Sequence, residues 1–302
     1  MINRTVTILS LFILTVVFLS CEDVIDVEVP TDNPRLNVNA LIRVDISQAY
    51  IPLEVKVSLT NNFFEEIPIT TVESILILAE EIDEDGVVIN SFTSSLAEIE
   101  PNTGIYRPDP NFSSDQRMPT IILQNKNVLF SLIIRHEGRA YLAQTKYVPT
   151  VPIDTVLQGN ATLIEGDETE IIITYTDDFE REDFYLFDFD FGEFLVTEDE
   201  FYQGQQFVFS YFYDRTFESG KELEISILGV DETFYNYMNQ IIVQSGDTQG
   251  PFQTPAATVR GNIFDVTDLD NLEVFDNVGQ PDIFPLGYFA VVQEYKRTVT
   301  IK

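Results

Sequence analysis

One thiol offers the most specific chemistry in this sequence. Cys21 is the only cysteine among 302 residues, and it follows a nearly apolar run from Val6 to Leu19 that Arg4 precedes. A positive start, a short apolar stretch and a small residue before the cleavage point are typical of a secretory signal peptide. Bacterial lipoproteins carry their acyl chains on a cysteine at the new N-terminus. We therefore predict a lipoprotein signal peptide over residues 1–20 and lipid attachment at Cys21.

The same N-terminal pattern also fits two alternatives. Lipoprotein signals favour leucine three residues before the cysteine, and this chain has Phe18 there. A plain signal peptide, or an uncleaved anchor with an unrelated cysteine, would give a similar pattern. The apolar run is shorter than the roughly 20 residues that a membrane-spanning helix needs. The sequence offers no second membrane-spanning candidate.

Charge and motif content narrow the classes of partner. The chain has 50 acidic and 17 basic residues and a formal net charge of −33. Such a surface repels nucleic acid and anionic lipid headgroups, so no nucleic-acid partner is expected. It is compatible with a cation, a basic partner or plain solubility. The single histidine, His136, is predicted to lie exposed in a tight turn over 135–139. Without a histidine or cysteine cluster, a phosphate-binding loop or a nucleophile elbow, we expect no metal, no cofactor and no catalytic residues.

Two acidic features could in principle do chemistry. Asp188 and Asp190 fall on the same face of a predicted strand, and a carboxylate pair can bind a cation or hydrolyse a glycoside. Two aspartates in line on a strand also form a solvated face, so we assign them no role. The run Glu80–Gly86 resembles a cation-binding loop but lacks the spacing and final glutamate of an EF-hand. We interpret it as a hairpin turn.

The elements around these residues are mostly strands. Residues 21–34 are acidic and contain two prolines, which favours a tether between the lipid and the folded body. From 35 to 150, alternating apolar residues predict short strands, as at Leu53–Thr60, and a hairpin turns at Glu137-Gly138. The other strands are predicted at 36–42, 72–79, 104–106, 127–134 and 140–148. This pattern is typical of a β-sandwich.

A proline-rich boundary at 149–154 separates a second, more acidic region over 151–302. Strands are predicted there at 161–164, 169–175, 184–194, 207–213, 223–230, 258–263 and 287–293. Asp231 is a good N-cap for one amphipathic helix over 232–244. Its apolar stripe is expected to pack in the core and consists of Phe234, Tyr237, Met238, Ile241 and Ile242. The predicted fold class is therefore mainly β, with two β-sandwich-like domains in tandem and one packed helix in the second.

Two strands of the second region each place four aromatic residues on one face. The first face is Tyr185, Phe187, Phe189 and Phe191, and the second is Phe207, Phe209, Tyr211 and Tyr213. Each ring buries about 150–250 Å², so the two faces are expected to form the core against each other or against the helix. The alternative is an exposed aromatic platform for a sugar or a peptide.

Several short motifs, taken in order, resemble one family. They are Cys21–Asp26, Pro34–Val38, Gly104–Tyr106, Gly138–Tyr141 with Val148–Asp154, and Gly250–Phe252 through Gly261–Ile263 to Leu286–Phe289. The chain resembles an uncharacterised family of Bacteroidota lipoproteins that is defined by a domain of unknown function. Members are often encoded beside TonB-dependent outer-membrane receptors. Many relatives carry cysteines in the second domain, and this chain has none there.

The resemblance implies a lipid-anchored outer-membrane protein, at the cell surface, with a TonB-dependent receptor as partner. It also implies a non-catalytic first domain like the transthyretin-like or carboxypeptidase-regulatory sandwiches, and only Cys21 carries over as a site. Our first functional hypothesis is an accessory or ligand-capture subunit of a TonB-dependent transporter. The second is a structural subunit of an outer-membrane assembly without a small ligand. A glycosidase or protease is a third hypothesis, which we do not favour.

Overall fold

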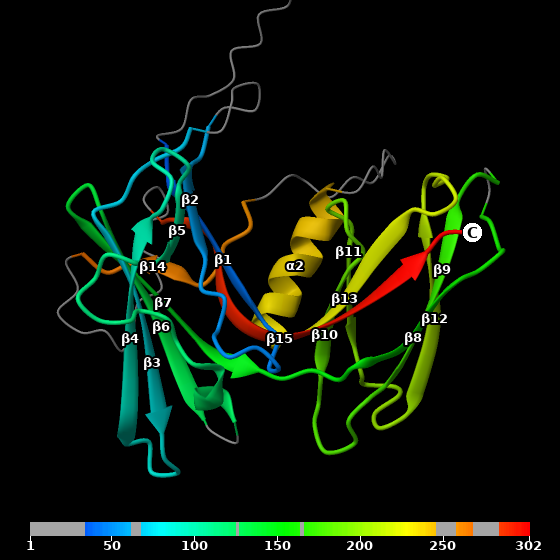
Figure 1. The fold of residues 1–302 in the computed structure, drawn as a ribbon, viewed down its shortest axis with the longest axis horizontal. Helices are drawn as coiled ribbons and strands as arrows, with labels where there is room; N and C mark the ends of the chain where they lie inside the picture. The colour runs from blue at the N-terminus through cyan, green and yellow to red at the C-terminus, as the bar shows by residue number, and fades with distance from the viewer. Residues whose placement is uncertain (1–33, 62–67, 125–126, 164–165, 246–257, 268–283) are drawn as a thin grey trace, which may run out of the picture. The chain divides into compact units, whose positions relative to one another are not determined.

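The computed structural model describes residues 34–61, 68–124, 127–163, 166–245, 258–267 and 284–302 (Figure 1). The predicted signal peptide, Cys21 and nearly all of the 21–34 tether lie outside these residues. Residues 33–302 form one compact unit. In the described ranges, no helix is long and apolar enough to cross a membrane.

The first half of the chain forms most of a closed ring of eight strands. The order around this barrel-like ring is β15-β1-β2-β5-β4-β3-β6-β7, and β7 pairs with β15 to close it. Alternate residues such as Val38, Ile42 and Phe130 point inward and are fully buried. The strands are β1 Leu36–Val44, β2 Val55–Leu59, β3 Ser74–Ile82, β4 Val88–Glu98, β5 Ile105–Pro108, β6 Val128–His136, β7 Arg139–Val148 and β15 Leu286–Thr300.

The second half extends this sheet and covers it with another. Strands β10, β11 and β13 continue the sheet beyond β15 in the order β11-β10-β13-β15, while β12-β9-β8 form a separate three-stranded sheet. Aromatic and aliphatic side chains from the two sheets share one buried cluster. The elements are β8 Ile153–Gln158, β9 Thr169–Thr176, β10 Phe184–Asp188, β11 Phe194–Glu198, β12 Gln206–Tyr213, β13 Glu222–Val230, α2 Glu232–Ser245 and β14 Ile263–Asp265.

The last strand belongs to both halves. Its first part pairs in parallel with β1, from Asn37↔Leu286 to Val44↔Gln293, and its second part pairs with β13 up to Glu222↔Thr300. β15 and β1 pass close together at Gly287, whose φ is +97°. A Cβ there would lie 1.8 Å from the carbonyl oxygen of Val38. Glycine is required at this position because any side chain would collide with β1.

The prediction of a mainly β chain is confirmed. The strands do not, however, separate cleanly into two tandem sandwiches at residue 150. One twelve-stranded sheet runs through β15, and β14 pairs with β7 of the first half. A parallel pairing over such a distance along the chain leaves no mark on local periodicity, so the sequence could not reveal it.

Three local predictions need correction. His136 is 6% exposed and its Nδ1 lies 3.1 Å from the carbonyl oxygen of Thr71, so it is a buried strand residue and not an exposed turn residue. The strand predicted over 184–194 breaks at a turn, where Asp190 and Phe191 have φ of 65° and 52°. Residues 161–163 form no strand, and of 258–263 only Ile263 belongs to one.

Two predicted turns and the helix are observed. Of the run Glu80–Gly86, the first three residues end β3 and residues 83–86 form the turn into β4, with the amide of Gly86 donating to the carbonyl oxygen of Asp83. The hairpin of β6 and β7 turns at Glu137-Gly138, both with positive φ. At the start of α2, Asp231 Oδ1 accepts a hydrogen bond of 2.7 Å from the amide of Phe234, which is the expected N-cap.

Candidate binding groove

A groove of about 820 Å³ lies beside α2. One wall is the apolar stripe of α2, and the floor is the outer face of β1 and β15, outside the ring. The turn that joins β10 to β11 supplies the far wall. The lining side chains include Asn37, Asn39, Leu41, Leu186, Glu193, Phe194, Tyr211, Phe234, Tyr237, Met238, Ile241, Ile242 and Tyr288.

Strand alternation and helix periodicity explain why these residues meet. In β1 the even-numbered residues fill the ring, so the side chains of Asn37, Asn39 and Leu41 point to the other face. On α2, Phe234 is buried against the sheet, whereas Ile241 and Ile242 are half-buried. The stripe therefore covers the sheet at its start and leaves the groove open towards the end of the helix.

Aromatic rings form the base of the groove. The ring centroid of Tyr288 lies 4.7 Å from that of Phe234 and 4.9 Å from that of Tyr237. Burial raises the pKa of both tyrosine hydroxyls above the ordinary value. These phenols therefore stay neutral across the physiological range and can donate or accept hydrogen bonds to a bound molecule.

The polar groups of the groove are few. Asn37 Nδ2 donates to Ser58 Oγ at 3.2 Å, and Asn39 is exposed. Glu193 accepts a hydrogen bond of 2.6 Å from the hydroxyl of Tyr211 and forms a close ion pair with Arg215, so its charge is largely compensated. Among the described lining residues no Lys, Arg or His occurs. The groove is thus suited to a molecule with apolar or aromatic parts and a few hydrogen-bonding groups.

The two aspartates singled out in the sequence lie outside the groove and next to each other, with the amide of Asp190 donating a hydrogen bond of 2.9 Å to Asp188 Oδ1. Asp188 forms an ion pair of 2.6 Å with Arg43, which also pairs closely with Glu294. Asp188, Arg43 and Glu294 come from β10, β1 and β15. The two ion pairs of Arg43 therefore connect strands of the two halves of the sheet. Asp190 is exposed in the turn. Neither lines the groove, whose described residues include one carboxylate, Glu193, and not the two that glycoside hydrolysis requires.

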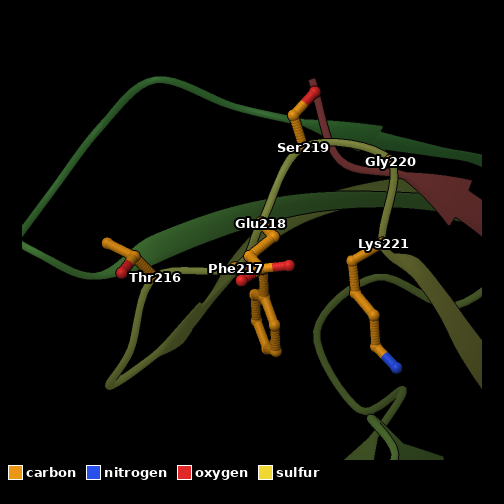
Figure 2. Close-up of a pocket in the computed structure, with 6 residues that line it drawn as sticks. All are labelled: Thr216, Phe217, Glu218, Ser219, Gly220 and Lys221. Atoms are coloured by element: carbon orange, nitrogen blue, oxygen red, sulfur yellow. The ribbon is translucent and has the colours of Figure 1, made fainter.

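Two smaller hollows are less suited to ligand recognition. Figure 2 shows one of about 540 Å³ whose six lining residues, 216–221, come from one turn between β12 and β13. Side chains from a single turn do not converge on a ligand from several directions. The other, of about 570 Å³, is lined in part by Thr120, Tyr147 and Arg181, and this arginine is engaged with Asp183 at 2.9 Å.

The aromatic faces predicted for the second region form its core. The rings of Phe189 and Tyr211 stack with centroids 3.7 Å apart, and those of Phe187 and Phe209 meet edge to face at 5.1 Å. The structure therefore favours the core interpretation over the exposed platform. Phe191 is the exception, because the turn at 190–192 leaves it 45% exposed.

Three buried aspartates lie at one end of this core. Asp177, Asp183 and Asp199 are each less than 10% exposed. Burial raises the pKa of the Asp183 carboxyl, and the neighbouring Arg181 opposes this only in part. Burial and the charge of Asp177 also raise the pKa of Asp199. In the described part of the chain Asp199 forms no ion pair, and its Oδ2 accepts a hydrogen bond from the amide of Asp183 at 2.9 Å.

Replacing Asp199 by asparagine is therefore expected to stabilise the protein at pH 7. A carboxyl with a raised pKa in the folded state holds its proton more tightly there than in the unfolded chain, so stability is lost as pH rises through that folded-state pKa. Asparagine keeps the acceptor and removes the charge. The difference in unfolding free energy between variant and wild type, measured by urea denaturation, should be positive at pH 7 and shrink towards zero near pH ~4. A pH-independent loss of stability would contradict this.

Sequence reasoning found the helix stripe but not the groove. The stripe residues Tyr237, Met238, Ile241 and Ile242 were expected to be core, and all line the groove. Asn39, Glu193 and Tyr288 carried no signal by themselves. Ile241 and Ile242 give the one available hint, because they continue the apolar stripe to the end of the helix.

Comparison with known proteins adds a family but no activity. No curated protein matches the chain. Among solved structures, red sea bream transglutaminase is 7% identical with a TM-score of 0.22, covering 89% of this chain and 31% of its own. A two-domain fibronectin type III segment of chicken tenascin is 10% identical with a TM-score of 0.17, covering 66% and 92%.

At these TM-scores neither structure supports an argument about fold or function. The chain spans less than a third of the transglutaminase. A family model, by contrast, matches residues 22–272, which is most of the chain. The protein therefore belongs to the family described as Domain of unknown function (DUF4249).

Proposed function

We propose that the protein is a lipid-anchored binding module of the outer membrane, which captures a ligand in the α2 groove as an accessory subunit of a TonB-dependent transporter. The observation that carries the binding role is the groove itself. Pockets of about 300–1,000 Å³ lined by apolar and aromatic side chains with a few polar groups are typical small-molecule sites. The groove has this size and this lining.

The chemistry of the lining defines the class of ligand. Aromatic rings and aliphatic side chains favour a molecule with an apolar or aromatic part. Asn39 and Tyr288 line the groove and supply hydrogen-bonding groups to it. The chain carries a net charge of −33, and such a field disfavours anions. The proposed ligand is therefore neutral or cationic, and a single compensated carboxylate supports binding rather than hydrolysis.

The membrane part of the proposal rests on the N-terminal sequence. The family match begins at residue 22, directly after the proposed attachment site Cys21. We also propose that the first region acts without catalysis, in the manner of the transthyretin-like or carboxypeptidase-regulatory sandwiches. In the alternative, a structural subunit of an outer-membrane assembly, the groove would hold no ligand.

Filling the groove is expected to abolish capture of an apolar probe. Ile241→Trp places a large ring in the groove from a half-buried position, which the fold can accept. Asn236→Trp makes the same change at an exposed position of α2 that does not line the groove. Nile red, a neutral apolar dye, should bind wild type and Asn236→Trp with the same Kd in a fluorescence titration. The Kd of Ile241→Trp should rise by about tenfold or more, a loss of about 1.4 kcal/mol.

Equal binding to all three proteins would place the dye elsewhere and refute the groove as the capture site. Thermal unfolding of both variants serves as the control for folding. If a variant unfolds at the wild-type temperature but binds the dye more weakly, the substitution has changed the groove and not the overall fold.

A further inference from the structure

Two loops at one end of the second core carry the most exposed large apolar side chains in the described ranges. Phe179, between β9 and β10, is 74% exposed, and Phe201, between β11 and β12, is 84% exposed. Exposing a phenylalanine to water forfeits about 1.5–3 kcal/mol that burial would contribute. Single exposed apolar residues are common, but two on adjoining loops form a feature that needs an explanation.

The two loops lie against each other. A Cβ placed on Gly204 would lie 2.5 Å from the Cβ of Phe179. The amide of Asp177 donates to the carbonyl oxygen of Gln205 at 3.1 Å, and Gln203 Nε2 donates to the carbonyl oxygen of Arg181 at 3.0 Å. Phe179 and Phe201 therefore belong to two loops that adjoin each other. We call this surface, with residues 178–182 and 200–204, the phenylalanine tip.

Buried carboxylates fix the base of the phenylalanine tip. Asp177 Oδ2 accepts from the amide of Gly204 at 2.7 Å, which joins one loop to the other. Asp199 Oδ2 accepts from the amide of Asp183 at 2.9 Å, and the hydroxyl of Tyr185 donates to Asp183 at 3.0 Å. Burying three carboxylates lowers stability unless they are well bonded. Here the hydrogen bonds order two loops that carry exposed rings, and such pre-ordering reduces the entropy lost on binding.

The charge around the tip restricts what can cover it. Glu180, Glu182 and Glu200 are exposed beside the two rings. A second copy of this chain, with its net charge of −33, and an anionic lipid surface would both be repelled. Lysine or arginine on a partner would be attracted, and complementary charge of this kind selects partners and speeds encounter.

We infer that the phenylalanine tip is a docking surface for a partner protein that offers an apolar socket with a rim of lysine and arginine. Phe179 and Phe201 enter the socket, and the three glutamates face the basic rim. Two rings held by ordered loops match the usual anatomy of an interface, with an apolar centre and a polar rim. The tip shares no residue with the groove, so this inference goes beyond the proposed function and does not rest on it.

Photo-crosslinking in the native cell tests the inference. The full-length protein would carry p-benzoylphenylalanine at position 179, at 201, or at 112 as the control. Phe112 is 50% exposed in a loop of the ring. Positions 179 and 201 should give an adduct with one and the same protein, and the crosslinked peptide should carry lysine or arginine beside apolar residues. Position 112 should give about tenfold less of that adduct or none.

Charge reversal provides the second arm. The triple change Glu180→Lys, Glu182→Lys and Glu200→Lys should lower the adduct yield from position 179 by about tenfold. The matched triple change Glu84→Lys, Asp85→Lys and Glu100→Lys, on turns of the ring, should leave it unchanged. Adducts with lipid, with a second copy of this chain or equally from position 112 would overturn the inference, as would an unchanged yield after reversal at the tip. The dye titration uses purified protein, so its outcome is independent.

Discussion

Replacing Cys21 by alanine is expected to move the protein from the membrane to the soluble fraction. Acyl chains contribute about 0.8 kcal/mol per buried methylene, and more than one chain is needed for stable anchoring. The change removes the proposed acylation site and therefore the acyl chains. Cell fractionation and metabolic labelling with a fatty-acid analogue measure the two consequences, release and loss of label.

Cys21→Ser is the matched variant, because it keeps a small polar residue at the cleavage point and cannot form the thioether. It should behave as Cys21→Ala. Continued membrane partition of both variants without label would show that another segment holds the protein there. Release together with retained label would show that acylation occurs elsewhere.

Removing one aromatic ring from the second core is expected to destabilise the whole folded body. Phe187 is fully buried, and its ring centroid lies 5.4 Å from Tyr175 and 5.1 Å from Phe209. Phe→Ala at such a site costs about 3–5 kcal/mol, out of the 5–15 kcal/mol by which most domains are stable. Because β15 carries residues of both cores, Phe187→Ala should lower the stability of the ring as well.

Denaturation followed by two signals tests this coupling. Far-ultraviolet circular dichroism reports all strands, whereas near-ultraviolet dichroism reports mainly the packed tyrosines of the second core. The two urea transitions should coincide in wild type. Phe187→Ala and Phe289→Ala, which removes a fully buried ring from the first core, should each shift the single transition. Two separate transitions, with each variant shifting one, would show that the halves fold independently.

Local signals in the sequence predicted many of the elements, but not the strands β4 and β8. Asp231 marked the start of α2, and the two residues Glu137-Gly138 marked a hairpin turn whose backbone has positive φ at both positions. The aromatic faces predicted to meet do so, for example at Phe189 and Tyr211. Each of these features depends on residues close in sequence or on the character of one strand face.

Features that depend on pairing between distant segments were missed. β15 pairs with β1, about 250 residues earlier in the chain, and with β7, which closes the ring. The error at His136 is of another kind. The neighbouring turn residues suggested that it is exposed. In β6, however, every second side chain from Val128 onward is buried, and His136 is the last of this series. The groove could not be foreseen, because it needs β1, β15 and α2 to be positioned together.

We propose that a lipid-anchored binding module acts together with an outer-membrane receptor. Native mass spectrometry of the full-length protein, extracted from its own outer membrane in mild detergent, tests it most directly. The expected result is a chain that begins at an acylated Cys21 and is bound to a TonB-dependent receptor. An unmodified chain that leaves the membrane alone, with no receptor bound, would contradict the account.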